Sequence, residues 1–287
     1  MTGRLPKKTS SLLKCGRIEY TNDLPIYAAF DAGAIAYPGS LHADVPATLN
    51  AMLVNGKLDL SPISAFAYAQ HASDLVLLPD LCIGARDRVI SVILVSPTPP
   101  ALLDGAKIFV TAESASGRNL LRILLERRYG VHAEFIETAD PSTHARNGNP
   151  TLLIGDRAID ALLSLPPEHI YDLGTLWHDF TGEQTVFAVW AARKAAYAAH
   201  PQEVRACMHA LTDSYTWGRG NMSTVVKAAN TICARPDGFY ENYYAQLNFT
   251  LHSAAQSGLA AYYRELLAIG AIDRLPPSIP EVIGVSA

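Results

Sequence analysis

The chain lacks the features that mark proteins of nucleic acids and membranes. Its 23 lysines and arginines form no dense basic run and its formal net charge is −4, so the sequence offers no electrostatic footprint for nucleic acid. No segment reaches the roughly 18 uninterrupted apolar residues of a membrane span. We therefore expect neither nucleic acid nor a membrane as a partner.

Common catalytic and metal-binding motifs are missing as well. The nine histidines are scattered without an HxxxH or HExxH arrangement, which argues against a metal site. The sequence contains no G-x-S-x-G elbow of the hydrolases. It also lacks a glycine-rich phosphate loop between a strand and a helix, which argues against nucleotide binding.

Cysteines are few, and their spacing fits neither disulfides nor zinc. The four are Cys15, Cys82, Cys207 and Cys233. Without CxxC spacing and in apolar surroundings, they are expected to be reduced core residues of a cytoplasmic protein. A signal peptide is not expected, because Lys14 and Arg17 interrupt the apolar run that begins at Leu12. We expect residues 1–11 to form a loose tail.

What the chain does contain is typical of an α/β protein. Its 287 residues are 49% hydrophobic and 17% charged, enough for two lobes with cores of their own. Strands and helices alternate up to about residue 193, and helices dominate afterwards. Strands are predicted at 12–20, 40–45, 58–60, 75–78, 89–95, 107–110, 131–136 and 152–154, with an extended run at 185–191. Helices are predicted at 26–31, 46–54, from 61 onward, 117–128 and 156–164.

A proline-rich linker at 96–100 divides this pattern. We expect residues 97–189 to form a second lobe, inserted into a first lobe made of 1–96 and 190–287. The chain would then cross between lobes twice, near Ser96 and near Val189. Two crossings make a hinge, and a cleft between lobes is the natural site for a small ligand.

The turn Thr21-Asn22-Asp23 is the first candidate for that site. It follows the first predicted strand, and ligands of α/β sheets tend to bind at the carboxyl ends of strands. The amide of Asn22 can donate and accept at once, which suits an oxygen-rich small molecule. The alternative is a capping turn before the next helix.

Hydroxyl side chains stand at two further helix starts. Ser61 and Ser64 flank one of them, and Thr111, Ser114 and Ser116 precede another. Free N–H groups and hydroxyls at a helix N-terminus favour an anion. Two such sites on opposing lobes would hold two carboxylates, although N-capping alone also explains each hydroxyl.

Three further residues and one short segment are also considered: Ser91, Gly155, Asp156 and residues 86–88. Ser91 is the lone polar residue of an apolar strand and has no capping role there, although a bond to a neighbouring carbonyl would satisfy it. Gly155 would let a ligand approach the backbone, and Asp156 is expected to cap the following helix. The segment 86–88 is either a self-paired surface turn or the source of an arginine for a substrate carboxylate.

Together these segments resemble the chorismate dehydratase family of menaquinone biosynthesis by the futalosine route. The matching segments are GRIEYTN at 16–22 with Pro25, GKLDLSPIS at 56–64, LPD at 78–80, IG at 83–84, VISV at 89–92, LIGDRA at 153–158, DLG at 172–174 with Trp177, TG at 181–182 and FAVW at 187–190. The resemblance covers most of residues 12–195 and is weaker in the C-terminal helices.

The resemblance implies a two-lobed clamshell similar to type II periplasmic binding proteins. It also implies conversion of the dicarboxylate chorismate to 3-[(1-carboxyvinyl)oxy]benzoate by loss of water, without metal or organic cofactor. Asn22 and Ser91 match the positions assigned to the reaction, and Ser61, Ser64, Thr111, Ser114, Ser116 and Gly155 are expected to bind substrate. No strong general base stands out among the matched residues, and one solution is that a substrate carboxylate is the base.

Some positions depart from the family pattern, and two other functions stay open. The departures are Ala115, where a second hydroxyl is expected, the charged turn 86–88, and 182–185; they raise the question of substrate preference. One alternative is a non-catalytic cytoplasmic sensor or carrier of a small carboxylate, built on the same clamshell. The other is the sister enzyme that forms dihydroxynaphthoate, which should have a histidine near the cleft; neither His132 nor His144 stands in a matching motif. The sequence does not fix the oligomeric state.

Overall fold

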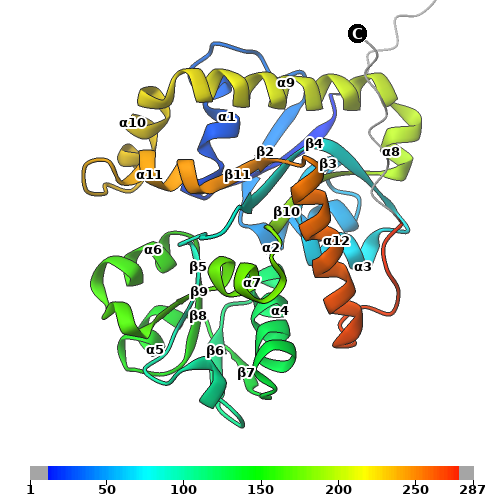
Figure 1. Cartoon of the computed structure of the whole chain (residues 1–287). Helices are drawn as coiled ribbons and strands as arrows, with labels where there is room; N and C mark the ends of the chain where they lie inside the picture. The colour runs from blue at the N-terminus through cyan, green and yellow to red at the C-terminus, as the bar shows by residue number, and fades with distance from the viewer. Residues whose placement is uncertain (1–11, 278–287) are drawn as a thin grey trace, which may run out of the picture.

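The computed structural model describes residues 12–277 and contains two β-sheets flanked by helices (Figure 1). Strands and helices alternate through most of the chain, so the predicted α/β class is confirmed. The tail expected at residues 1–11 lies outside the described residues.

The larger sheet combines strands from both ends of the chain. Its six strands lie in the order β11-β4-β10-β3-β1-β2. They are β1 Lys14–Ile18, β2 Ser40–Asp44, β3 Leu60–Ser64, β4 Leu75–Ala85, β10 Thr185–Arg193 and β11 Leu247–Thr250. β1 is parallel to β2 and β3, whereas β10 is antiparallel to β3 and β4. The sheet is therefore mixed, with β4 and β10 as its longest strands.

The smaller sheet is built from the middle of the chain. Its five strands lie in the order β7-β6-β8-β5-β9. They are β5 Val92–Val95, β6 Lys107–Val110, β7 Glu134–Glu137, β8 Thr151–Ile154 and β9 Ile170–Asp172. β6 is parallel to β7 and β8, and β5 is antiparallel to β8 and β9.

The chain passes between the sheets earlier than predicted at both crossings. β5 already belongs to the smaller sheet, so the first passage lies at 86–91, before the proline-rich segment. β10 belongs to the larger sheet from Thr185, so the return lies at 173–184 and not near Val189. The prolines follow the first strand of the new sheet and do not form the passage itself. The division of the chain into two lobes stays a prediction.

The helices cover both sheets. They are α1 Leu24–Asp31, α2 Pro46–Val54, α3 Ala65–His71, α4 Ala115–Ile123, α5 Pro141–Arg146, α6 Gly155–Ser164, α7 Leu173–Thr181, α8 Lys194–Ala199, α9 Pro201–Gly220, α10 Met222–Ile232, α11 Phe239–Gln246 and α12 Ser253–Ala268. Among the C-terminal helices, α9 packs across α1, while α12 packs against β10, α3 and α4 (Figure 1). α4 to α7 accompany the smaller sheet in the lower half of that view.

Two local predictions were wrong. Residues 61–64 form the end of strand β3, not the start of a helix, because β3 pairs with both β1 and β10 and all five of its residues are buried; tertiary pairing here overrides the local preference of serine and proline for turns. The predicted strand at 89–95 begins only at Val92. β4 runs to Ala85, and β9, β11, α5 and α7 were not anticipated.

Apolar faces of the C-terminal helices lie in the core. Val204, Cys207 and Leu211 of α9 are buried, as are Leu259 and Leu266 of α12. All four cysteines are free thiols; three are buried and Cys233 is half-buried. The C-terminal helices thus bury one apolar face each, as amphipathic helices of soluble proteins do.

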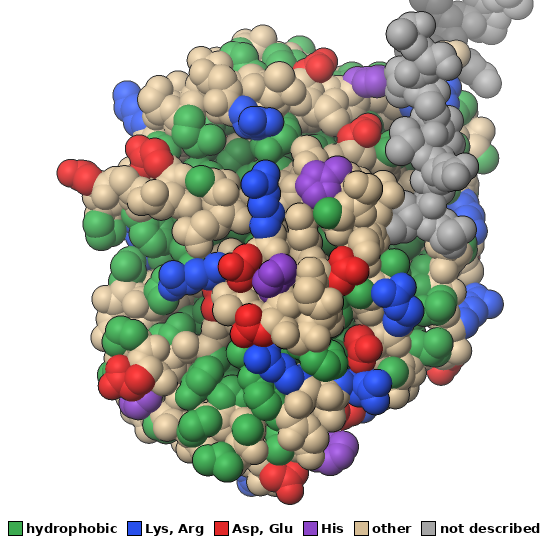
Figure 2. Space-filling model, in the orientation of Figure 1, with side chains coloured by type: hydrophobic (Ala, Val, Ile, Leu, Met, Phe, Trp, Pro, Cys, Tyr) green, Lys and Arg blue, Asp and Glu red, His purple; other side chains and the backbone are tan. Residues whose placement is uncertain are grey.

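Charges of both signs share the surface. Figure 2 shows lysine and arginine side chains interspersed with aspartate and glutamate on one face of the molecule. Between residues 12 and 277, every helix falls short of the length or the hydropathy that a membrane span requires.

Candidate active site

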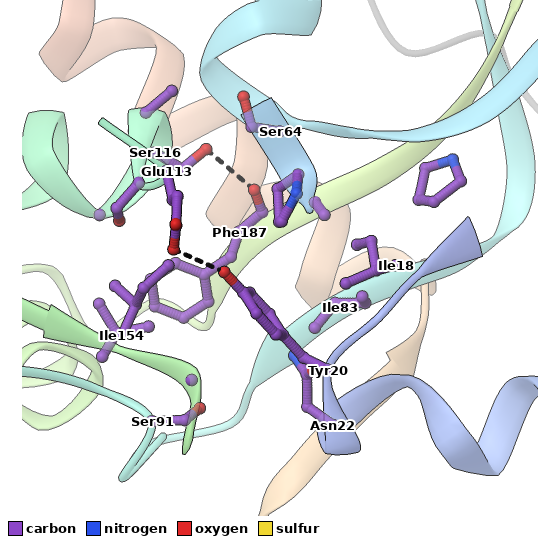
Figure 3. Close-up of a pocket in the computed structure, with 18 of the residues that line it drawn as sticks. Ile18, Tyr20, Asn22, Ser64, Ile83, Ser91, Glu113, Ser116, Ile154 and Phe187 are labelled. Carbon is purple, nitrogen blue, oxygen red and sulfur yellow. Dashed lines mark hydrogen bonds between the residues drawn. The ribbon is translucent and has the colours of Figure 1, made fainter. Parts of the chain in front are cut away.

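One cavity has walls from both sheets (Figure 3). It is lined by Ile18, Tyr20, Asn22, Pro46, Asn50, Pro62, Ser64, Ile83, Val89, Ser91, Val92, Glu113, Ser114, Ala115, Ser116, Gly117, Ile154, Gly155, Phe187, Ala188 and Leu247. Much of the lining is apolar, with a few polar groups that would fix a ligand's orientation, as in small-molecule sites generally.

The structure brings six of the eight predicted site residues to this cavity and leaves two outside. Asn22, Ser64, Ser91, Ser114, Ser116 and Gly155 line it. Ser61 does not, because its buried hydroxyl donates to the Pro62 carbonyl at 2.8 Å and packs against Gly16. Thr111 faces a different hollow, and its Oγ1 accepts from the Glu113 N–H at 3.2 Å. We remove Ser61 and Thr111 from the proposed binding set.

Asn22 stands in a one-turn 3₁₀ helix at Thr21–Asp23, between β1 and α1. Two hydrogen bonds fix this turn: the Thr21 hydroxyl to Asp156 Oδ1, and the Tyr244 hydroxyl to the Thr21 carbonyl, each 2.9 Å. The amide oxygen of Asn22 is buried and has no partner within residues 12–277. Burying an acceptor without a partner costs about 1–3 kcal/mol of folding free energy. The amide oxygen of Asn22 is therefore still able to accept a hydrogen bond from a ligand in the cavity.

Ser91 is positioned by a strained turn. Ile90 has φ of 53°, which is unusual for a β-branched residue, and the Ser91 N–H donates back to the Val89 carbonyl at 2.7 Å. The half-buried Asp172 carboxylate stabilises this turn by accepting from the N–H groups of Val89 at 3.1 Å and Ile90 at 2.6 Å. Burial raises the pKa of Asp172, and these N–H donors oppose the shift. Ser91 therefore precedes strand β5 and does not lie within it.

The residue after strand β8 is hydrogen-bonded to the same turn. Gly155 has φ of 57°, a conformation that favours glycine, and its N–H donates to the Ser91 carbonyl at 2.8 Å. The Ser91 hydroxyl makes one long hydrogen bond, 3.3 Å to the Val89 carbonyl. A ligand oxygen would compete well with so long a contact.

The remaining serines differ in the hydrogen bonds that their side chains already make within the protein. Ser64 caps α3 by accepting from the Ala67 N–H at 3.1 Å, as the capping alternative foresaw. The Ser116 hydroxyl donates to the Phe187 carbonyl at 2.9 Å and accepts from the Phe66 N–H at 3.2 Å. Ser114 precedes α4 without any side-chain capping bond. Ser114 and the first N–H groups of α4 are thus the polar groups most available to an anion.

Tyr20 and Glu113 also line the cavity, although neither was a predicted site residue. The Tyr20 hydroxyl donates to Glu113 Oε2 at 2.9 Å (Figure 3), which joins the end of β1 to the turn before α4. Burial, and next the hydrogen bond to Glu113, raise the pKa of Tyr20. No lysine, arginine or histidine is among the described lining residues. The sequence signal for Glu113 was its position between Thr111 and Ser114, in a turn whose hydroxyl groups were predicted to bind substrate.

A second carboxyl, Asp23, lies next to the site without lining it. It is fully buried, neither of its oxygens has a partner within residues 12–277, and burial raises its pKa to about 7, opposed by Arg17. Its folded-state pKa thus lies above the ordinary value of 3.8. The contribution of the protonated carboxyl to the free energy of unfolding is therefore complete below pH 3.8 and is lost as pH rises through about 7.

We predict that an Asp23→Asn variant has a flatter stability profile than the wild type. Because asparagine cannot ionise, its free energy of unfolding should change less between about pH 5 and about pH 8, where the wild type loses stability. Urea denaturation at the two pH values measures this. Parallel profiles for the two proteins would show that Asp23 does not titrate in this range.

Comparison with known proteins places the chain in a family. A family model described as menaquinone biosynthesis matches residues 13–267. The chain belongs to this menaquinone biosynthesis family. A chorismate dehydratase of Thermus thermophilus is 34% identical to it over 242 residues, 79% of this chain and 86% of that protein. The family resemblance drawn from the sequence is therefore confirmed.

Solved structures confirm the predicted periplasmic-binding-protein-like fold of this family member. The periplasmic aliphatic sulphonate binding protein of Escherichia coli superposes with a TM-score of 0.65 at 14% identity, covering 95% of this chain and 91% of that one. A Candida albicans protein described as having the generic periplasmic binding protein fold gives 0.65 at 11% identity, covering 97% and 95%.

The two histidines weighed from the sequence do not line the cavity. The His144 ring stacks on Phe109, with ring centroids 3.7 Å apart, and His132 is exposed near Glu126. The histidine that the sister enzyme of the pathway should have is thus not among the described lining residues.

Proposed function

We propose that the chain is a chorismate dehydratase, a hydro-lyase that forms 3-[(1-carboxyvinyl)oxy]benzoate for menaquinone on the futalosine route. The observation that carries the proposal is that one cavity joins Asn22, Ser91 and the start of α4, in a chain 34% identical to a chorismate dehydratase. A cytoplasmic location and independence from metal or organic cofactors are parts of the same proposal.

In this proposal the cavity binds chorismate through neutral donors. One carboxylate accepts from Ser114 and from the first N–H groups of α4, whose helix dipole favours negative charge. The ring lies against the apolar side chains of Ile83, Ile154 and Phe187 (Figure 3). Asn22 and Ser91 contact the oxygen substituents of the ring from the opposite end of the site.

The dehydration removes the proton on ring C3 and the hydroxyl on C4, and aromatisation drives it. Asn22 and Ser91 orient the ring and stabilise charge that develops as the proton leaves, because fixed dipoles in a site closed to water act strongly on such charge. The rigid turns that hold both residues suit this task, since neither has to reorganise during the reaction.

Incubation of the purified chain with chorismate, without added metal or cofactor, tests the proposal. We expect the aromatic absorbance of a benzoate to appear and chorismate to lose one water by mass spectrometry. Tight binding without conversion would contradict the enzyme and favour the sensor or carrier. Release of dihydroxynaphthoate from a cyclised futalosine, with chorismate untouched, would favour the sister enzyme.

A further inference from the structure

A groove outside the cavity lies where helices α9, α10 and α11 meet strand β11 and the turn that follows β4 (Figure 1). Its lining combines charged side chains with aromatic rings. We propose that this groove is a second binding site, for an aromatic monocarboxylate, and that its occupant weakens the binding of an anion in the neighbouring cavity.

Two arginine side chains give the groove positive charge. Arg86 belongs to the charged segment 86–88 after β4, and Arg219 stands in the last turn of α9. Both are exposed and line the groove, and neither forms an ion pair within residues 12–277. Arg86 therefore neither pairs with Asp87 nor lines the cavity. A guanidinium presents a planar fork of donors that fits a carboxylate.

The charge of the lining sets the charge of the ligand. Among the described lining residues Glu241 is the one carboxylate, and it is exposed. Two positive charges and one negative charge leave one positive charge unmatched. A ligand with a single carboxylate would balance it, whereas a dianion would be in excess.

Aromatic side chains provide the surface for a ring. The ring centroids of Tyr215 and Phe249 are 5.4 Å apart, and the guanidinium carbon of Arg219 lies 6.0 Å from the centroid of the Tyr215 ring. Burial raises the pKa of Tyr215, and the charges of Arg219 and Arg86 oppose this rise. Both cations thus act on the same ring. A ligand ring packed here would gain aromatic contacts while its carboxylate faces the guanidinium groups.

The neutral polar side chains of the groove already have partners in the protein. Asn248 donates through Nδ2 to the Thr250 carbonyl at 2.9 Å and accepts from the Thr250 hydroxyl at 3.1 Å. The Tyr244 hydroxyl donates to the Thr21 carbonyl at 2.9 Å. The two guanidinium groups are therefore the side-chain donors that an anion in the groove would use.

The groove and the cavity share a wall. Leu247 lines both, and Tyr244 of the groove is hydrogen-bonded to Thr21, next to Asn22 of the cavity. Lysine, arginine and histidine are absent from the described lining of the cavity, so the arginines of the groove contribute positive potential beside it. An anion that neutralises them makes the cavity less favourable for a second anion, and this coupling is reciprocal.

Fluorine NMR titration with 4-fluorobenzoate tests the binding site. We expect a dissociation constant of about 1 mM or lower, raised at least about tenfold in a variant with both Arg86→Gln and Arg219→Gln. The probes 4-fluorobenzyl alcohol, without the charge, and trifluoroacetate, without the ring, should bind at least about tenfold more weakly. Arg205→Gln is the matched control, exposed on the same helix but outside the groove, and should bind 4-fluorobenzoate as the wild type does.

The second readout rests on the proposed function. In dehydration assays at constant ionic strength, saturating 4-fluorobenzoate should raise the KM of the wild type for chorismate about twofold or more and leave kcat unchanged. It should leave the KM of the double arginine variant unchanged.

The outcomes separate this inference from the proposed function. Equal affinity of the wild type and the double arginine variant, or loss of binding in Ser114→Ala, would place the probe in the cavity and overturn the second site. Binding in the groove without a change in KM would overturn the coupling. If the wild type does not dehydrate chorismate, the proposed function fails, and the NMR titration still decides whether the groove binds an aromatic monocarboxylate.

Discussion

Replacing Asn22 with alanine should lower kcat/KM for chorismate by at least about 10³-fold while the protein stays folded. Loss of a fixed dipole at the reacting centre typically costs 10²–10³ in rate, and Asn22 also orients the ring. The amide oxygen makes no hydrogen bond to residues 12–277, so truncation breaks no such contact in the fold. We expect the melting temperature to stay within about 4 °C of wild type. Steady-state kinetics and a thermal scan measure both quantities.

Asn55→Ala is the matched control for this variant. It makes the same chemical change at an exposed position after α2, away from the cavity, and should have wild-type kinetics. Near-normal turnover in Asn22→Ala would remove Asn22 from the site. An inactive variant that has also lost its cooperative melting transition would instead assign Asn22 a structural role.

Replacing Trp190 with alanine should destabilise the protein by about 3–5 kcal/mol, the usual range for a buried tryptophan. Trp190 is fully buried in β10, the strand between β3 and β4 in the larger sheet. Because the surrounding sheet cannot collapse into the space, a cavity would remain. Against a typical total of about 5–15 kcal/mol, this loss is large enough to unfold a sizeable fraction of the chain on mild heating.

Urea denaturation of Trp190→Ala and Trp190→Phe checks this prediction. The phenylalanine variant should lose less stability, since it fills most of the space and leaves no indole N–H to satisfy; Trp190 Nε1 has no partner within residues 12–277. If Trp190→Ala and the wild type have equal free energies of unfolding, the Trp190 side chain does not contribute to the stability of the core as predicted.

Local patterns were enough to predict most of the α/β frame. β1, β2 and β6 fall inside predicted strands, β8 begins one residue before its predicted strand, and α2 and α6 match their predicted ranges closely. These elements have a strong apolar period or clear end signals, such as Pro46 at the start of α2. Residues 61–64 failed because pairing with β1 and β10 decides their conformation, and such long-range pairing leaves no mark on a single segment.

The candidate site was partly predictable for a related reason. Asn22 and Gly155 stand at strand ends, where α/β proteins bind ligands, and the cavity includes both. Ser61 and Thr111 look the same locally, but only the folded chain shows that their hydroxyls serve neighbouring backbone groups. The Tyr20–Glu113 hydrogen bond joins residues 93 positions apart, and periodicity cannot reveal such a contact.

The proposed function requires that chorismate lose water in this cavity. The most direct measurement is mass spectrometry of chorismate incubated with the wild type and, in parallel, with Asn22→Ala. We predict a product lacking one water from the wild type and unchanged chorismate from the variant. Unchanged chorismate from a folded wild type would contradict the proposed function, and equal product from both proteins would contradict the role of Asn22.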